Sequence, residues 1–455
     1  MLRPVVAGIF AGLALALGSA SPPAAGAGPA AEDARVAWLR DEAVAIRSID
    51  PGDEDFSDLR PLGAALAGAR VVVLGEATHG DGATFLAKTR LVRFLHRELG
   101  FDVLAFESGF YDCWKAWQRI EAGEDPELAF RQSVFSVWTL SAQVQPLIDH
   151  VSASARSERP LVLSGIDPQF TGELSGRFLL GDLTRVAEAV GVAGDRLAER
   201  VSGPLANLVE GRYELGELPE PAARAALLEA LADLRERLLR DGGSVPDRGF
   251  WLRFLESTRD NAVASWSRDW NRPVLESPEE YAVRERLMGE QLAWLARERF
   301  PGRKIVVWMH SGHAARGLAG VEVPSPVHAR LYRTLQPAGA VAHAALGNEL
   351  YTVGVLAYQG RFATVFRDRP EELLRPTEGS LEDLLHRTGL AHAFLDLRRS
   401  GRAPEWLRAP LIARPIGYKE MRARWHEVFD GVVFLDRMEV SERMSEGVPT
   451  DHSSD

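Results

Sequence analysis

The sequence predicts an α/β fold in which a mainly parallel central sheet is flanked by helices and interrupted by a helical insertion. Two observations lead to this fold class. Short apolar runs that fit buried strands alternate with longer segments of helical periodicity, and such alternation is typical of parallel sheets with right-handed crossovers. Between about residues 171 and 300 the composition shifts to Leu, Ala, Arg and Glu, which indicates a block of helices or a cap.

We expect the chain to divide into five segments. They are a signal peptide and flexible leader at 1–30, the first part of the α/β domain at 31–170, the helical insertion or cap at 171–300, the second part of the α/β domain at 301–440, and a flexible tail at 441–455. The insertion would therefore interrupt one domain rather than form a separate one.

The N-terminus has the features of a secretory signal peptide. Arg3 supplies a positive charge, residues 5–17 form an apolar run, and small residues suitable for cleavage follow. The apolar run is too short to cross a bilayer comfortably, so we expect no integral membrane span after cleavage. The sequence thus predicts an exported protein, periplasmic or secreted.

Charge and cysteine content narrow the class of protein further. The formal net charge is −11 at pH 7, and no basic patch stands out, which argues against a nucleic-acid partner. Cys113 is the single cysteine, so no intramolecular disulfide can form. It lies in an aromatic helical stretch, FYDCWKAW, where a buried structural thiol is expected.

The elements follow from hydrophobic periodicity, taken in chain order. Helices are expected at 34–47, 58–67 and 82–99, the last ended by Gly100. Strands are expected at 71–74, 102–106, 160–166, 304–309, 351–356, 362–366, 391–395 and 431–435.

Polar side chains follow several of these strands at the point where each strand ends. The residues concerned are Glu76, His79, Glu107, Asp167, His310 and His313. Because parallel strands place their carboxyl ends at one edge of the sheet, where ligands bind in open α/β folds, we expect these side chains to converge. The strand 71–74 is the clearest case, since it runs through Gly75 directly into a carboxylate and an imidazole.

Imidazole and carboxylate groups at one edge support two mechanisms. In the first, a carboxylate fixes the tautomer of a histidine that removes a proton from water attacking an acyl carbon. In the second, Glu76, His79, Glu107, His310 and His313 bind a divalent metal that acidifies the water. A third possibility is a periplasmic binding protein that uses this edge without catalysis. The sequence has no G-x-S-x-G motif, so a serine-based α/β-hydrolase site is not expected.

Several motifs together resemble the erythromycin esterase family of hydrolases. They are GEATHG at 75–80, FES at 106–108, RERLMGEQLAWL at 284–295, VVWMHSGHAAR at 306–316 and YKEMRARWHEVFDGVVFLD at 418–436. The resemblance spans nearly the whole chain after the leader. It implies hydrolysis of a small-molecule ester or lactone, with no certain cofactor.

The resemblance also implies roles for individual residues. His79 would be the general base, supported by Glu76 and Glu107, with His310 and His313 completing the site. Arg284 and Glu290, on the helix before the HxxH strand, match positions in the family that are either structural or directly behind the site. Further substrate contacts are expected from Lys88, Arg90, Trp138, Asp167, Trp251 and Trp270.

The chain departs from the macrolide-inactivating members of the family at two positions. Those members carry Glu four residues after the active histidine and Arg nine residues after it, whereas this sequence has Ala83 and Lys88. We therefore expect a member of the family whose substrate is not settled rather than a macrolide-resistance esterase.

Overall fold

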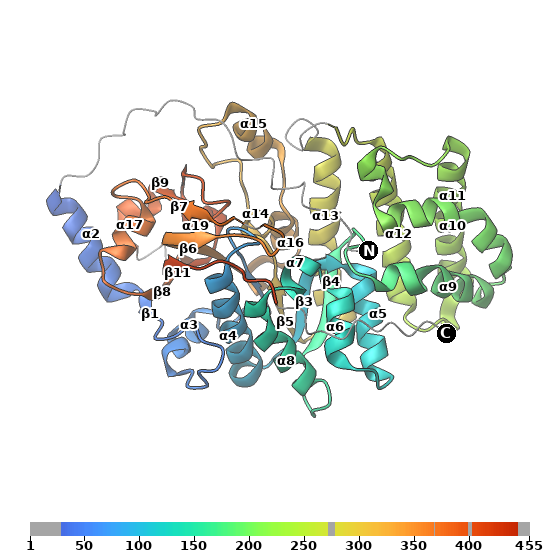
Figure 1. The fold of residues 1–455 in the computed structure, drawn as a ribbon, viewed down its shortest axis with the longest axis horizontal. Helices are drawn as coiled ribbons and strands as arrows, with labels where there is room; N and C mark the ends of the chain where they lie inside the picture. The colour runs from blue at the N-terminus through green and yellow to red at the C-terminus, as the bar shows by residue number, and fades with distance from the viewer. Residues whose placement is uncertain (1–28, 272–277, 368, 399–402, 445–455) are drawn as a thin grey trace.

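The computed structural model describes residues 29–271, 278–367, 369–398 and 403–444 (Figure 1). The predicted signal peptide lies almost wholly outside these residues, and so does the tail from 445 onward. Within the described part, no helix is both long and apolar enough to cross a membrane.

One large sheet forms the centre of the molecule. Its strands, in spatial order, are β1 (Val44–Ala45), β8 (His392–Asp396), β11 (Gly431–Met438), β6 (Leu350–Phe362), β2 (Val71–Leu74), β5 (Lys304–Trp308), β3 (Phe101–Gly109) and β4 (Val162–Asp167), and β7 (Glu371–Leu373) pairs with the end of β6. The strands from β11 to β4 are parallel, whereas β1, β7 and β8 pair antiparallel. The prediction of a mainly parallel sheet is confirmed.

Burial on both faces explains the sequences of the central strands. All four residues of β2 are buried, and β2 lies between β5 and β6 with Val71 opposite Ile305 and Leu350. Strands covered on both faces by helices are near-continuous runs of Val, Ile and Leu, as here. Consequently the groups that follow β2 start from a rigid, fully paired strand.

Helices cover the sheet and extend it on one side (Figure 1). Those of the α/β part are α2 (Pro29–Glu42), α3 (Arg60–Ala65), α4 (Gly82–Leu99), α5 (Phe110–Glu121), α6 (Pro126–Ser133), α7 (Ser136–Thr139), α8 (Gln145–Ser154), α14 (Ser311–Ala314), α15 (Pro326–Thr334), α16 (Ala338–Leu346), α17 (Leu381–His386), α18 (Glu405–Arg408) and α19 (Trp425–Val428). A small hairpin, β9 (Leu411–Ala413) with β10 (Met421–Ala423), lies outside the main sheet.

In the segment expected to be helical, 171–300, the described residues form five long helices. They are α9 (Leu174–Ala189), α10 (Gly194–Glu210), α11 (Pro221–Asp241), α12 (Arg248–Ser267) and α13 (Pro278–Trp294). Figure 1 shows α10 and α11 beyond the β4 edge of the sheet, with α13 between that block and the sheet. The block therefore extends the sheet sideways, and α13 is the member that reaches the strand ends.

Some predicted element boundaries are wrong. The helix predicted at 34–47 ends at Glu42, because the chain turns there to add β1 to the sheet edge. Instead of a helix over 58–67, a 3₁₀ turn at 57–59 leads into α3. No separate strand forms at 362–366, since the backbone N–H of Ala363 donates to the carbonyl of Gly80 instead of joining a ladder.

The predicted tail begins too early in the sequence. The N–H of Ser441 donates to the carbonyl of Gly80, and the Ser441 hydroxyl lies 2.8 Å from that of Ser141. The N–H of Met444 in turn donates to the carbonyl of Leu140. Residues 441–444 are therefore part of the folded domain.

Candidate active site

The carboxyl ends of β2, β5, β3 and β4 bring the predicted polar residues to one edge of the sheet. Close packing fixes the first of these strand ends, because a Cβ on Gly75 would lie 2.6 Å from the Ser311 hydroxyl and 2.8 Å from the carbonyl of Val353. Only glycine allows the turn after β2 to approach the turn after β5 so closely.

Glu76 is the buried anchor of the site. Its side chain has no exposed surface and accepts hydrogen bonds from three groups: His79 Nδ1 at 2.7 Å, Lys88 Nζ at 2.7 Å and Trp138 Nε1 at 2.9 Å. A buried carboxylate needs such partners, and a cation among them balances its charge. Glu76 is thereby held rigidly, and it fixes the ring of His79 in turn.

Lys88 enters the site from α4. Its ammonium group bonds to Glu76 and lies 4.1 Å from the centre of the Trp308 ring. Burial lowers the pKa of Lys88 to about 8, although the carboxylate of Glu76 opposes this shift. Lys88 therefore lies beneath the site as the counter-charge of Glu76 and makes no exposed contact surface.

His79 is the most exposed of the three predicted site histidines. Its side chain is 17% exposed, against 1% for His313, and His310 is 2% exposed as a whole residue. The imidazole stands edge-on to the ring of Trp138 at 5.3 Å and to that of Phe135 at 6.5 Å. Phe135 is itself only partly buried, so an aromatic surface lies beside this histidine.

The tautomer of His310 is set by two backbone groups. Nδ1 accepts the N–H of Gly312 at 3.0 Å, so the hydrogen is on Nε2, which donates to the carbonyl of Ala77 at 2.8 Å. Burial and the neighbouring histidines His79 and His313 hold the pKa of His310 well below its usual range. A neutral ring with both nitrogens engaged ties two turns together and has no nitrogen left for proton transfer.

His313 lies between two buried carboxylates. Nδ1 is 2.5 Å from Glu285, and Nε2 is 3.1 Å from Glu107. Although burial lowers it, the charges of Glu107 and Glu285 raise the pKa of His313 to about 10. The ring is accordingly an imidazolium at neutral pH, and it serves as a fixed positive charge.

Arg284 provides a second fixed cation from α13. Its guanidinium bonds to both oxygens of Asp167, the nearest at 2.5 Å, and to Glu107 at 3.1 Å. The two carboxylates hold the pKa of Arg284 well above its usual value despite burial. Although burial opposes it, the charges of His313 and Arg284 keep the pKa of Glu107 well below its usual range.

Of the remaining predicted residues, Trp138 and Asp167 lie in this cluster, whereas four others do not. Arg90 holds the 48–58 loop through Asp58 at 2.8 Å. Trp251 is buried in an aromatic cluster with Trp114 at 5.2 Å. Trp270 packs on Tyr213 and donates to the carbonyl of Ser265. Glu290 pairs with Arg253 and Arg286 at 2.8 Å and 3.0 Å.

The three substrate-binding assignments, Arg90, Trp251 and Trp270, are corrected by packing, whereas Glu290 has the structural role that was one of its two expected roles. Arg90 is buried because it pairs with Asp58, a loop carboxylate that precedes it in the chain. Trp251 and Trp270 pack against aromatic side chains of neighbouring helical segments. Glu290 lies one turn and a half along α13 from Glu285, on the face that meets α12. Their side chains therefore stabilise the scaffold rather than contact a ligand at the strand ends.

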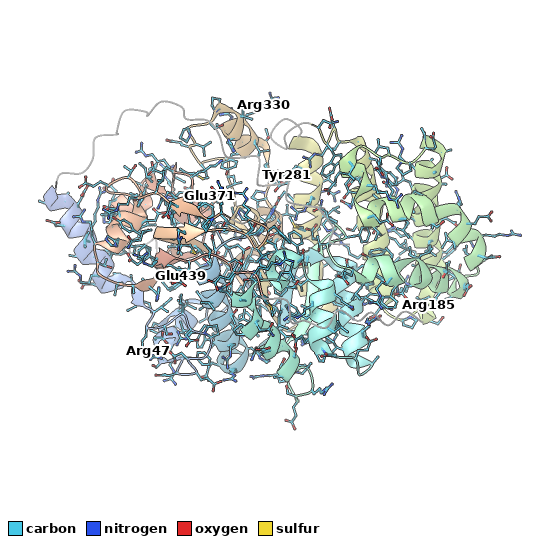
Figure 2. The ribbon with its side chains drawn as sticks, in the orientation of Figure 1. Arg47, Arg185, Tyr281, Arg330, Glu371 and Glu439 are labelled. Atoms are coloured by element: carbon cyan, nitrogen blue, oxygen red, sulfur yellow. The ribbon has the colours of Figure 1, made fainter. Side chains whose placement is uncertain are left out.

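Two residues of the cluster were missed in the sequence. Glu285 follows Arg284 directly and binds His313, and its second oxygen accepts the N–H of Ala338 at 2.8 Å. Tyr281, labelled in Figure 2, lies one turn before Glu285 on α13, with its ring 6.2 Å from that of His313. The available signal was the 3.6-residue spacing of α13, which places Tyr281 and Glu285 on one face.

The donor set does not fit the metal-binding alternative. Both nitrogens of His310 are engaged by backbone groups, His313 is protonated between two carboxylates, and Glu76 is bound by three donors. In the described part of the chain, no group of three or more His, Cys, Asp or Glu side chains is arranged to hold a metal ion.

Comparisons with known proteins agree with this fold. Among proteins of similar sequence, YbfO of Bacillus subtilis (strain 168), provisionally named a hydrolase, is 26% identical over 88% of this chain and 90% of its own length. Erythromycin esterase type II of Escherichia coli is 22% identical over 89% of this chain and 98% of its own.

Solved structures share the fold at lower identity. A Bacillus cereus protein matches with a TM-score of 0.72 at 18% identity, over 91% of this chain and 99% of its own. A succinoglycan biosynthesis protein matches with a TM-score of 0.71 at 19% identity, over 91% and 100%. A mutant of the erythromycin esterase EreC in its open conformation matches with a TM-score of 0.61 at 16% identity, over 87% and 97%.

The family itself is identified by a match to its sequence model. The erythromycin esterase model matches residues 96–438, which include β3 to β11 and therefore Glu107, Arg284, His310 and His313. This match confirms the resemblance drawn from the motifs. The chain belongs to the erythromycin esterase family of hydrolases.

Proposed function

We propose that this protein is an exported hydrolase that cleaves an ester or lactone bond of a small molecule with water activated by His79. The observation that carries the proposal is the His79–Glu76 pair: a 2.7 Å contact fixes Nδ1 of the one site histidine that keeps an exposed edge. A carboxylate that holds Nδ1–H orients Nε2 as the acceptor of a proton.

The reaction needs two proton transfers, and His79 performs both. Nε2 takes one proton from water as the water oxygen bonds to the carbonyl carbon, giving an imidazolium and a tetrahedral oxyanion. When the bond to the alcohol oxygen breaks, the imidazolium returns the proton to that oxygen. The products are a carboxylic acid, which ionises, and an alcohol, and in a lactone both remain in one opened molecule.

Charge around His79 favours its role as base. Glu76 carries the negative charge that stabilises the transient imidazolium, and Lys88 and Trp138 keep that carboxylate in place. Near His310, Arg284 and His313 offset two of the three charges of Glu107, Asp167 and Glu285. The developing oxyanion would thus form near two fixed cations that offset most of the carboxylate charge.

The substrate class is proposed as a general ester or lactone. Ala83 is buried in α4, and Lys88 is occupied by Glu76, so neither side chain presents a polar group to a large polyhydroxylated ring. The partly exposed ring of Phe135 beside His79 favours an apolar acyl or alkyl group near the scissile bond.

Export is part of the proposal and rests on residues 1–30. The positive residue, apolar run and small residues at the N-terminus support cleavage by a signal peptidase. N-terminal sequencing of the protein recovered from cell fractions tests it. A mature N-terminus between about residues 20 and 30 outside the cytoplasm is expected, and an intact Met1 in the cytoplasm would contradict it.

Activity is tested on purified protein with aryl esters of increasing acyl length and with lactones, each with and without a chelator. The wild type should hydrolyse at least one series, and His79→Gln should lose ~100-fold or more in kcat. His150→Gln is the matched control, because His150 contacts another histidine, His96, at 3.0 Å, outside the cluster. Binding without turnover would favour a binding protein, and loss of activity in chelator would favour a metal enzyme.

A further inference from the structure

The turn that carries His79 is closed by a buried carboxylate two residues later. Asp81 has no exposed surface; its Oδ2 accepts the N–H of Thr78 at 2.9 Å, and its Oδ1 accepts the Thr78 hydroxyl at 2.6 Å. The same hydroxyl accepts the N–H of Gly80 at 3.1 Å. Hydrogen bonds therefore join the residues before and after His79, namely Thr78 with Gly80 and Asp81.

Asp81 occupies the N-cap position of α4 but does not cap that helix. Its side chain makes no hydrogen bond to the first turn of α4 and faces back toward Thr78 instead. An aspartate at this position usually bonds to the helix N–H groups and stabilises the helix start. Here Asp81 does not stabilise the helix start in this way, and both of its carboxylate oxygens bond to Thr78 in the His79 turn.

A second segment contacts the turn from the far end of the chain. The N–H of Gly417 donates to the carbonyl of Ala77 at 2.9 Å, the same oxygen that His310 bonds. The next residue, Tyr418, has φ of +53°, a left-handed conformation that is unfavourable for a residue with a Cβ. This strained backbone brings the buried Tyr418 hydroxyl beside Asp81.

The Tyr418 hydroxyl and the Asp81 carboxylate form a buried polar pair. They lie outside ideal hydrogen-bond geometry but influence each other: burial raises the pKa of Asp81 to about 7 and Thr78 and Tyr418 oppose that shift, while Asp81 adds to the effect of burial in raising the pKa of Tyr418. In the described residues, this hydroxyl has no hydrogen-bond partner of ordinary geometry.

A third segment, residues 439–441, also supports the turn. The N–H of Gly82 donates to the carbonyl of Glu439 at 2.8 Å, and the N–H of Ser441 donates to that of Gly80 at 3.0 Å. Glu439 is labelled in Figure 2. These are backbone contacts and fix the path of the chain, whereas Thr78, Asp81 and Tyr418 act through side chains that substitution can alter singly.

We propose that Thr78, Asp81 and Tyr418 are positioning residues that hold His79 in register with Glu76 during the reaction. The inference rests on the proposed role of His79 as general base. The three residues touch neither water nor substrate in this role; they fix the turn so that Nδ1 of His79 stays on the Glu76 oxygen. A displacement near 1 Å at such a group can cost about 100-fold in rate.

The test compares variants that remove one side-chain contact each. Thr78→Val removes the hydroxyl at constant shape, Thr78→Ser restores it, Asp81→Asn removes one acceptor, and Tyr418→Phe removes only the hydroxyl. The matched control is Tyr111→Phe, because the Tyr111 hydroxyl also bonds to a buried aspartate, Asp182, at 2.5 Å, in a pair that joins α5 to α9 and makes no hydrogen bond to the His79 turn. Assays with p-nitrophenyl esters at pH 8 give kcat and KM separately.

Positioning predicts a specific pattern. We expect Thr78→Val, Asp81→Asn and Tyr418→Phe to lower kcat by about tenfold or more with KM changed less than about twofold. Thr78→Ser should return most of the activity. Tyr111→Phe should lower the melting temperature and leave kcat unchanged. Equal kcat for wild type, Thr78→Val and Tyr418→Phe would overturn the inference.

A readout that needs no turnover separates this inference from the proposed function. The ¹⁵N chemical shifts of the His79 ring report its tautomer, which contact with Glu76 fixes as Nδ1–H in the wild type. The variants should show a mixture of tautomers, and Tyr111→Phe should not. If the wild type hydrolyses no ester yet the variants lose the fixed tautomer, the proposed function fails and the positioning role stands. An unchanged tautomer in all variants overturns the positioning role.

Discussion

The Nε2 atom of His310 lies 2.8 Å from the carbonyl oxygen of Ala77, so the strand end with the HxxH sequence is bonded directly to the turn with His79. This contact gives His310 a neutral, fixed tautomer, with Nδ1 taken by Gly312. A histidine that supports its neighbour through a backbone carbonyl has a different signature in experiments from one that transfers protons.

His310→Gln should therefore reduce stability and activity together. Burial keeps the pKa of His310 well below its usual range, so the ring does not titrate near neutrality and the acid limb of kcat/KM should stay where it is in the wild type. Melting temperature and pH–rate profiles measure both effects. Activity lost at unchanged melting temperature, with a moved acid limb, would make His310 a proton-transfer group instead.

His313→Gln should be among the most destabilising single changes in the site. It leaves Glu107 and Glu285 buried without their shared cation, and removing one partner of a buried ion pair costs about 3–5 kcal/mol. Urea unfolding measures the difference. Glu290→Gln is the control, since Glu290 pairs with arginines on a more exposed surface and should cost no more than about 1 kcal/mol. Equal losses for the two variants would contradict the buried imidazolium.

The same imidazolium makes stability depend on pH in a defined window. The pKa of His313 is raised to about 10 in the folded protein, against about 6.5 when unfolded, so its contribution is complete below pH ~6.5 and is lost as pH rises toward 10. Lys88, with its pKa lowered to about 8, opposes this trend from pH ~8 upward. Between pH 6.5 and 8 the unfolding free energy of the wild type should fall more steeply than that of Glu285→Gln. Parallel curves would show that Glu285 does not hold the proton.

Gly75→Ala and Gly181→Ala should change stability in opposite directions. A Cβ at Gly75 meets the Ser311 hydroxyl at 2.6 Å and the Val353 carbonyl at 2.8 Å, so overpacking should cost about 1–3 kcal/mol. A Cβ at Gly181, exposed within α9, meets only the end of Arg185 at 3.8 Å, and helix propensity should add up to about 1 kcal/mol. Thermal unfolding of the two purified variants decides, and a harmless Gly75→Ala would mean that the two turns are not in close contact.

The fold was predictable where local sequence and tertiary packing agree. The helix at 82–99 has the predicted ends because Gly100 adopts the left-handed conformation that stops it, with φ of +72°. The strand at 71–74 is equally clear, since both of its faces are buried and the sequence is apolar throughout. Where a tertiary contact replaces a local one, as for Ala363 on Gly80, the predicted strand at 362–366 was wrong.

The sequence predicted which residues of the site lie together where those residues follow the ends of parallel strands. Glu76, His79, Glu107, His310 and His313 could be grouped because parallel strands share an edge. Sequence could not assign their protonation states, which depend on the Ala77 carbonyl for His310 and on Glu285, brought by a distant helix, for His313. Arg90 was misassigned for a related reason: its partner Asp58 comes from a loop whose path no periodicity reveals.

Backbone hydrogen bonds join residues 439–441 to Gly80 and Gly82, and we expect them to matter for the order in which the chain folds during synthesis. A ribosome has already made every strand of the sheet before it reaches Glu439, yet the loop around His79 still lacks one of its supports at that stage. We expect that in a nascent or truncated chain the sheet is folded but the turn that carries His79 is not yet fixed, so the chain is inactive. The final residues of the domain would then act as the last step of maturation, so that hydrolysis begins only once synthesis of the domain is complete.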